Sequence, residues 1–197
     1  QCKFRSLSGT NVYWDFVELP SQILENWTYE KECLDLFAEH FQTKEKISAE
    51  MIEKLKRSAT FHEGRNTLRQ LSFALLDMAW HAEDPRNIGD LEEFEWSKTA
   101  DTEVMPRVRG TSISGGFSHI FSGGYSAGYY SYKWAEVLDA DAFEYFKDKG
   151  IFNEEVARKF RDNILSMGGT EHPMDLYKRF RGREPDPKAL LRRAGLI

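Results

Sequence analysis

Cysteine is scarce in this sequence, which has two cysteines, Cys2 and Cys33, among 197 residues. That number excludes a disulfide framework and a cysteine-based metal cluster. Because unpaired thiols persist in reducing compartments, it favours the cytoplasm, although one optional disulfide stays open. No run of about 18 apolar residues occurs, so we expect no transmembrane helix and no membrane partner.

An excess of basic residues is also absent. Asp and Glu number 32 against 27 Lys and Arg, which gives a formal net charge of −5. An acidic chain attracts neither nucleic acid nor an anionic membrane surface, so no nucleic-acid partner is expected. The first residues lack the apolar segment of a signal peptide, and the chain does not begin with methionine. We therefore expect a fragment or a processed piece.

Apolar residues recur with helical spacing along most of the chain, and no stretch alternates as a strand does. The predicted fold class is all-α, with at most a small hairpin near the N-terminus. With 41% hydrophobic residues, residues 1–197 are predicted to bury one core as a single domain. The predicted helices span about 16 or 21 to 41, 48–59, 65–82, 88–104, 125–147, 153–167, 173–181 and 187–194.

Three local patterns qualify these helices. Asp15 and Glu18 have the spacing of a capping box, whereas Pro20 is awkward inside the helix that they would begin. The segment 65–82 is strongly apolar and is predicted to lie at the centre of the fold. Residues 105–124 are rich in Gly, Ser, Pro and Arg, and a loop of that length is uncommon unless it is functional or disordered.

The most unusual stretch runs from Phe117 to Tyr132 and contains one histidine, two adjacent glycines and four tyrosines. The glycines allow a sharp turn. The spacing of Tyr125, Tyr129 and Tyr132 predicts three phenols on one face of a helix. With His119 they form a row of hydrogen-bond donors suited to one ligand. A tyrosine-rich packing seam explains the same pattern about as well.

Self-contained catalytic motifs are missing. No two of the five histidines stand at i and i+4, so the chain holds no complete zinc-protease helix. The string Gly124–Gly128 matches a nucleophile elbow, but a glycine-rich loop precedes it where that motif needs a strand. We therefore interpret this match as chance. Histidines 40, 62, 81 and 172 are expected to be surface or satisfied core residues.

Three motifs, taken together, resemble one family. They are Ser8–Val12 followed by Asp15–Gln22, then Phe117–Tyr132, and finally Gly168–Glu171 with Phe180–Pro185. In this order they are similar to the C-terminal part of the thimet oligopeptidase family of zinc metallopeptidases, within it to the peptidyl-dipeptidase and oligopeptidase A branch. The resemblance covers essentially the whole chain.

The resemblance implies a fold and an activity. The family carries a His-Glu-x-x-His helix before the Asp-Phe-Val-Glu element, and that helix is not in this sequence. The expected fold is the helical C-terminal part of a zincin-like oligopeptidase catalytic domain, with residues 105–124 in a long Gly-rich active-site loop. The parent enzyme is expected to hydrolyse short peptides with one zinc ion. The chain alone is expected to be inactive, to bind zinc weakly and to self-associate through an uncovered face.

The family's metal residues carry over to two positions. Glu18 matches the third zinc ligand, a carboxylate that joins two imidazoles and leaves one position open for water. Asp15 matches an acidic residue that orients a ligand histidine. Without the resemblance, Glu18 is more simply a capping-box residue.

The family's substrate residues carry over to the tyrosine-rich stretch. His119, Tyr125 and Tyr132 match the residues that hold the scissile carbonyl and the substrate backbone, with Tyr132 expected as the main oxyanion donor. Tyr129, Gly123 and Gly124 are expected to complete the substrate-binding face, the glycines as hinges of a closing loop.

Two questions stay open on the sequence alone. A substrate C-terminal carboxylate needs a basic partner, and Arg181, Arg183, Arg107 and Arg109 are candidates, the first two more simply structural. The sequence does not show whether the parent enzyme releases C-terminal dipeptides or cleaves peptides internally. A different class of function, a non-catalytic helical module that binds peptides through the tyrosines, is the alternative.

Overall fold

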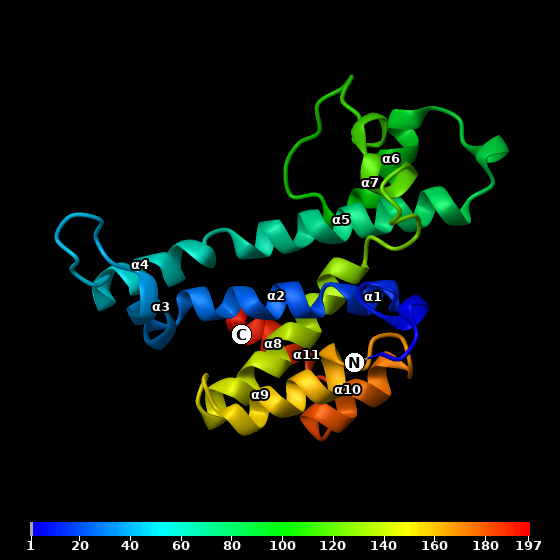
Figure 1. Ribbon diagram of the computed structural model, residues 1–197. Helices are drawn as coiled ribbons and strands as arrows, with labels where there is room; N and C mark the ends of the chain where they lie inside the picture. Colours follow the sequence, from blue (N-terminus) through cyan, green and yellow to red (C-terminus); the bar gives the residue numbers. More distant parts are fainter. Residues whose placement is uncertain (1) are drawn as a thin grey trace. The chain divides into compact units, whose positions relative to one another are not determined.

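The computed structural model describes residues 2–197 and is built from helices (Figure 1). Within these residues no strand forms, and the one antiparallel bridge joins Glu39 to Lys46. The all-α prediction is therefore confirmed.

No helix in the described part of the chain is long and apolar enough to cross a membrane. The chain divides into two compact units, a first made of residues up to Glu63 together with Ala135–Ile197, and a second of Gly64–Trp134. The single domain stays a prediction.

The first unit is organised around α8 (Ser131–Lys149), which belongs to it from Ala135 onward. In Figure 1, α9, α10 and α11 gather around this helix. It buries small and aromatic side chains together, including Ala135, Ala142 and Phe146. The remaining helices are α1 (Trp14–Val17), α2 (Leu19–Glu25), α3 (Lys31–Phe37), α4 (Ala49–Ala59), α9 (Glu154–Phe160), α10 (Pro173–Arg181) and α11 (Pro187–Arg193), with 3-10 turns at Arg5–Leu7 and Asn26–Tyr29 and a π turn at Arg161–Leu165.

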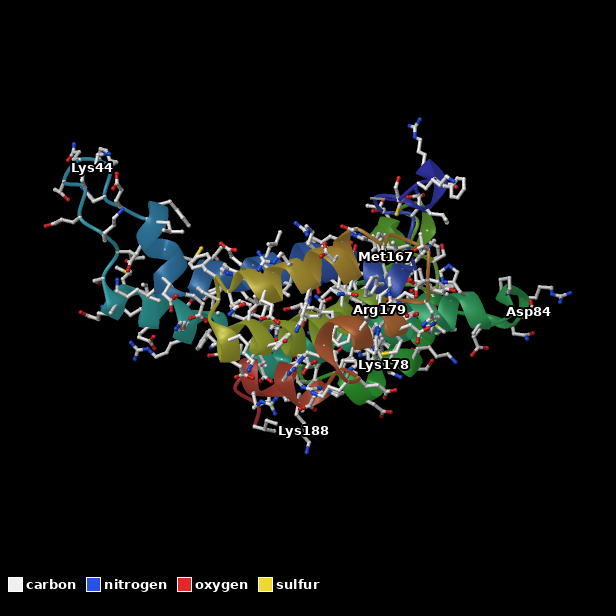
Figure 2. All side chains as sticks on the ribbon, turned by 60° about the horizontal axis from the view of Figure 1, so that its bottom comes forward. Lys44, Asp84, Met167, Lys178, Arg179 and Lys188 are labelled. Carbon is white, nitrogen blue, oxygen red and sulfur yellow. The ribbon has the colours of Figure 1, made fainter. Side chains whose placement is uncertain are left out.

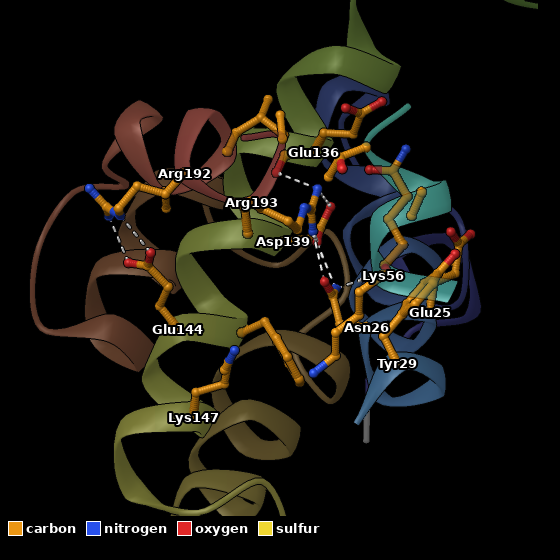
Figure 3. A pocket seen from close by; sticks show the side chains of 18 of the residues that line it. Glu25, Asn26, Tyr29, Lys56, Glu136, Asp139, Glu144, Lys147, Arg192 and Arg193 are labelled. Atoms are coloured by element: carbon orange, nitrogen blue, oxygen red, sulfur yellow. Dashed lines mark hydrogen bonds and ion pairs between the residues drawn. The ribbon is translucent and has the colours of Figure 1, made fainter. Parts of the chain in front are cut away.

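A polar network crosses the core of the first unit (Figure 3). Asp139 is 1% exposed and pairs with Arg193, while the amide of Asn26 donates to its Oδ1 at 2.9 Å. The network borders a cavity of about 660 Å3 between α2, α4, α8 and α11. Arg192 at its rim pairs with Glu144 at 2.8 Å. A carboxylate neutralises the charge of each of these arginines. The network therefore holds helices together and does not attract an anion.

The long helix expected from about 16 or 21 to 41 is broken into short pieces. Asp15 lies inside α1, and Glu18 precedes α2 without a side-chain cap, so the predicted capping box is wrong. Pro20 separates α1 from α2, because it has no backbone N–H to continue a helix and instead occupies the first turn of α2. Apolar side chains beyond this break stay exposed, among them Leu36 at 70% and Phe37 at 62%. Self-association through such a face stays a prediction.

The second unit contains α5 (Glu63–Ala82), α6 (Leu91–Thr99) and α7 (Ser118–Phe121), with 3-10 turns at Pro85–Asn87, Ala100–Thr102 and Ser114–Gly116. Predicted helices 65–82 and 88–104 are thus present, the latter shortened by the cap that Asp90 makes to the Glu93 N–H at 2.9 Å. The central position predicted for α5 is wrong. Leu75 and Met78 are each 45% exposed, and the helix buries only Leu76 and Asp77.

The glycine pair at 168–169 joins the two ends of the first unit. Gly168 has a φ of +54°, and a Cβ there would lie 2.1 Å from the Leu7 carbonyl oxygen. Gly169 N–H donates to the same oxygen at 2.9 Å. The thiol of Cys2 adds a contact of 3.1 Å to the carbonyl of Met167, which Figure 2 labels. Only glycine lets these backbones approach so closely.

Replacing Gly168 by alanine should therefore destabilise the protein by about 2–5 kcal/mol. The left-handed backbone costs about 1–2 kcal/mol, and forcing apart two packed backbones costs about 1–3 kcal/mol. The matched control is Gly182→Ala, because Gly182 has a φ of +83° but nothing within 4 Å of a Cβ. Urea unfolding of both variants measures the difference, and equal losses of stability would contradict the close approach.

Candidate functional site

The side chains of the tyrosine-rich stretch gather in the second unit. The rings of Tyr125 and Tyr132 stack with centroids 5.0 Å apart, and Tyr129 lies edge-on to Tyr132 at 5.3 Å. His119 lies 6.0 Å from Tyr125, 6.1 Å from Tyr129 and 6.3 Å from Tyr132. We name these four residues the donor cluster. Phenols and an imidazole gathered at one place can donate several hydrogen bonds to a single polar ligand.

The donor cluster does not form on one helix, so that prediction is wrong. Helix α8 begins at Ser131, six residues after the predicted start, and Tyr125 to Tyr130 lie in turns. Ala127 has a φ of +53°, which no α-helix accommodates. The rings meet because the turn folds back onto the first residues of α8. The three tyrosines therefore come together, but through a geometry that their spacing did not predict.

The two glycines make the sharp turn that the sequence predicted. A Cβ on Gly123 would lie 2.9 Å from the Cα of His119, so a side chain would collide with the backbone of α7. Gly124 has a φ of +87°. The turn lets the Tyr125 N–H donate to the His119 carbonyl at 3.1 Å, which brings the two rings together. A hinge role of these glycines stays a prediction.

The members of the donor cluster differ in environment. His119 is exposed, whereas Tyr125, Tyr129 and Tyr132 are half-buried. The Tyr129 hydroxyl donates to Gln70 Oε1 at 3.1 Å. Burial raises the pKa of the Tyr129 phenol, and nearby Tyr132 adds to the shift. Tyr129 is therefore a protonated phenol at neutral pH. Its hydroxyl is directed to Gln70 on α5, and its ring lies against Tyr132.

A buried carboxylate, which the sequence reasoning missed, holds the turn between Tyr125 and Tyr130. Asp77 on α5 is 0% exposed. It accepts hydrogen bonds from the Ala127 N–H at 2.9 Å and from the Tyr129 N–H at 2.8 Å. His81 lies 2.9 Å from its Oδ1, which agrees with the satisfied histidine expected there. An aspartate inside the apolar run of α5 was the signal available in the sequence.

A second buried carboxylate holds the start of the same segment. Glu95 on α6 is 4% exposed and accepts from the backbone N–H groups of Ile113 at 3.0 Å and Ser114 at 2.7 Å. The Ser112 hydroxyl donates to it at 2.7 Å. Burial raises the pKa of Glu95, but the hydrogen bonds from Ser114, Ser112 and Ile113 outweigh that effect and bring the net pKa below its ordinary value. Glu95 thus anchors the chain before the donor cluster, and Asp77 anchors the turn within it.

The candidate metal residues lie in the first unit. Glu18, at the junction of α1 and α2, is half-buried and accepts a hydrogen bond from the Ser21 hydroxyl at 2.9 Å. Asp15 lies one turn earlier in α1. Among residues 2–197 there is no group of three His, Cys, Asp or Glu side chains that could hold a metal ion. Glu18 suits one position in a coordination sphere, and the described residues do not complete a site.

The candidate arginines are all engaged within the chain. Arg181 and Arg183 both pair with Asp141, whose side chain is 0% exposed. In the second unit, Arg107 reaches the Thr99 hydroxyl at 2.6 Å and Arg109 reaches Glu93 at 2.6 Å. The structural interpretation of Arg181 and Arg183 is therefore favoured.

Comparison with known proteins places this chain among peptidases. The model of the family described as "Peptidase family M3" matches residues 1–196. Oligopeptidase A of Escherichia coli is 47% identical over 189 residues, which are 95% of this chain and 28% of that protein. The organellar oligopeptidase A of Arabidopsis thaliana is 44% identical over 95% of this chain and 24% of its own length. Dipeptidyl carboxypeptidase of Escherichia coli is 36% identical over 98% of this chain and 29% of its own length. The chain thus spans less than a third of the length of these relatives.

Proposed function

The chain belongs to peptidase family M3, and we propose that it is the part of an oligopeptidase that grips a short peptide substrate and supplies one ligand to a catalytic zinc ion. The family membership confirms the resemblance found in the sequence motifs. The observation that carries the proposal is the donor cluster, in which the imidazole ring of His119 lies 6.0–6.3 Å from each of three phenol rings.

The donor cluster is proposed to act on the scissile peptide bond. Hydrolysis turns the carbonyl oxygen of that bond into an oxyanion, and a donor placed about 3 Å from it stabilises the transition state. Tyr132 is assigned this role, because it stands at the start of α8 with a ring on either side. His119 and Tyr125 are assigned to the substrate backbone. Tyr129, whose hydroxyl reaches Gln70, keeps Tyr132 oriented.

Glu18 is proposed as one zinc ligand and Asp15 as the residue that orients another ligand. When bound, zinc supplies an activated water for attack on the peptide carbonyl. Glu18 fits this role as a carboxylate whose oxygen is already oriented by the Ser21 hydroxyl. Residues 2–197 hold no three-ligand group, and the other ligands are proposed to come from another part of the protein.

The proposal predicts metal-dependent peptide hydrolysis by the full-length protein. A short peptide of about five to ten residues with a fluorescent donor and quencher should be cleaved. A chelator should abolish cleavage, and stoichiometric zinc should restore it, because the activated water is lost and regained with the metal. Mass spectrometry of the products separates release of dipeptides from internal cleavage. Cleavage that persists after complete removal of zinc would contradict the proposal.

One observation favours a second function for the chain by itself. Because the described residues hold no complete metal group, the isolated chain is proposed to be inactive, and it would then bind peptides only through the donor cluster. Peptide binding without metal, together with a full-length protein that never cleaves, would favour this non-catalytic module. The cytoplasm is the proposed location, in line with one Arabidopsis relative that is named as cytosolic.

A further inference from the structure

Asp77 is a charged group in a place where a charge is costly. Its side chain is 0% exposed in the middle of α5, next to the fully buried Leu76. A buried carboxylate is tolerated only when hydrogen bonds replace the lost water. Asp77 receives them chiefly from a segment 50 and 52 residues away, from the Ala127 N–H to Oδ1 at 2.9 Å and from the Tyr129 N–H to Oδ2 at 2.8 Å. Each carboxylate oxygen thus binds one end of the same turn.

His81 completes the arrangement one turn further along α5. Its Nδ1 lies 2.9 Å from Asp77 Oδ1 and 2.8 Å from the Asp77 carbonyl oxygen. The Ala127 N–H also lies 3.3 Å from the same Nδ1. His81 therefore borders both the Asp77 carboxylate and the Ala127 amide that this carboxylate binds.

The turn that Asp77 holds is strained and carries the donor cluster. Ala127 has a φ of +53°, a conformation that a non-glycine residue adopts only when its surroundings impose it. Tyr125 precedes Ala127 by two residues, and Tyr129 and Tyr132 follow it within five. Releasing the amides of Ala127 and Tyr129 would let the turn relax and would move all three phenols.

We propose that Asp77 is a positioning residue for the reaction, one that fixes the tyrosine turn through the backbone without touching the substrate. The proposal rests on the proposed peptidase function. Simple packing does not account for Asp77, because an apolar side chain of similar size would fill the same space without the cost of a buried charge. A carboxylate is needed only if two convergent amides have to be held at once.

The test is the Asp77→Asn variant of the full-length protein. Asparagine has nearly the same shape but only one acceptor oxygen, so one of the two amides loses its partner. Hydrogen exchange of residues 125–131, followed by mass spectrometry, should become at least about tenfold faster, because the local opening free energy falls. The kcat for a short peptide should fall about 10²-fold with KM nearly unchanged. The reason is that displacing a hydrogen-bond donor by about 1 Å weakens binding of the transition state.

Two further variants keep the test decisive. Glu95→Gln alters the other buried carboxylate and should speed exchange at residues 112–116 while Ala127 and Tyr129 stay protected. His81→Leu removes the imidazole beside Asp77 and Ala127, a side chain that is 25% exposed, so this variant should fold even if Asp77→Asn does not. It should give a smaller rise in exchange of the same turn and a fall in kcat of several-fold.

Each outcome bears on one claim. Wild-type exchange at Ala127 and Tyr129 in the Asp77→Asn and His81→Leu variants would overturn the inference. Faster exchange with an unchanged kcat would overturn it as well, because the turn would then not position the reaction. A wild-type protein that cleaves no peptide would instead contradict the proposed function, and the exchange data would still decide whether Asp77 holds the turn.

Discussion

Replacing Tyr132 by phenylalanine should lower kcat about 10²–10³-fold, the effect of removing one oxyanion donor. The change deletes a single hydroxyl and keeps the ring. The stack with Tyr125 at 5.0 Å and the edge contact with Tyr129 at 5.3 Å depend on that ring, so the donor cluster should keep its arrangement. The loss should appear in kcat and less in KM, because the donor acts on charge that develops in the transition state. Steady-state hydrolysis of a short peptide measures both constants.

The matched control lies on the same helix. Tyr145 is also part of α8, but its ring packs against Phe180 at 5.7 Å within the first unit. Tyr145→Phe makes the same chemical change away from the donor cluster and should leave kcat at the wild-type value. If Tyr132→Phe also kept the wild-type kcat, Tyr132 would be a packing residue and the oxyanion role would fall to another donor.

Replacing Glu18 by alanine should remove zinc from the full-length protein and abolish peptide hydrolysis. A three-ligand catalytic site that loses its carboxylate keeps two imidazoles. We expect zinc affinity to fall by more than about 100-fold, the upper end of the loss caused by replacing a supporting residue. Asp15→Asn should lower zinc affinity less, by about 10–100-fold, because Asp15 is proposed only to orient a ligand. Zinc content after dialysis, measured by atomic emission, reports the loss independently of activity.

Glu25 provides the control for the metal claim. It is an exposed carboxylate at the end of α2, seven residues after Glu18. Glu25→Ala changes the net charge of the same region by the same amount and should keep one zinc ion per protein. Stoichiometric zinc in the Glu18→Ala variant would remove Glu18 from the ligand set.

Local signals explain what the sequence predicted well. Ser48 caps α4 by accepting from the Met51 N–H at 3.2 Å, and Asn153 caps α9 by accepting from the Glu155 N–H at 3.0 Å. Gly182 ends α10 with a φ of +83°. Caps of this kind act within a few residues, so one sequence is enough to find them. The family motifs likewise identified the residues of the donor cluster.

Long-range contacts explain what the sequence did not predict. The turn at Ala127 is fixed by Asp77, 50 residues earlier, and no local pattern encodes that pairing. The same spacing of Tyr125, Tyr129 and Tyr132 suits a helix face and a turn followed by a helix start, and the tertiary contact decides between them. Glu95 holds residues 112–114 across a shorter gap of 17 to 19 residues. The sequence therefore singled out the residues that gather in the donor cluster, but not the geometry in which they gather.

The most direct test of the proposed function is a crystal structure of the full-length protein with zinc, with the metal located by anomalous scattering at the zinc edge. We predict one strong peak with an oxygen of Glu18 at about 2.0–2.2 Å, together with histidine ligands from outside residues 2–197. A zinc ion coordinated entirely by other residues, with the Glu18 carboxylate turned away, would contradict the account.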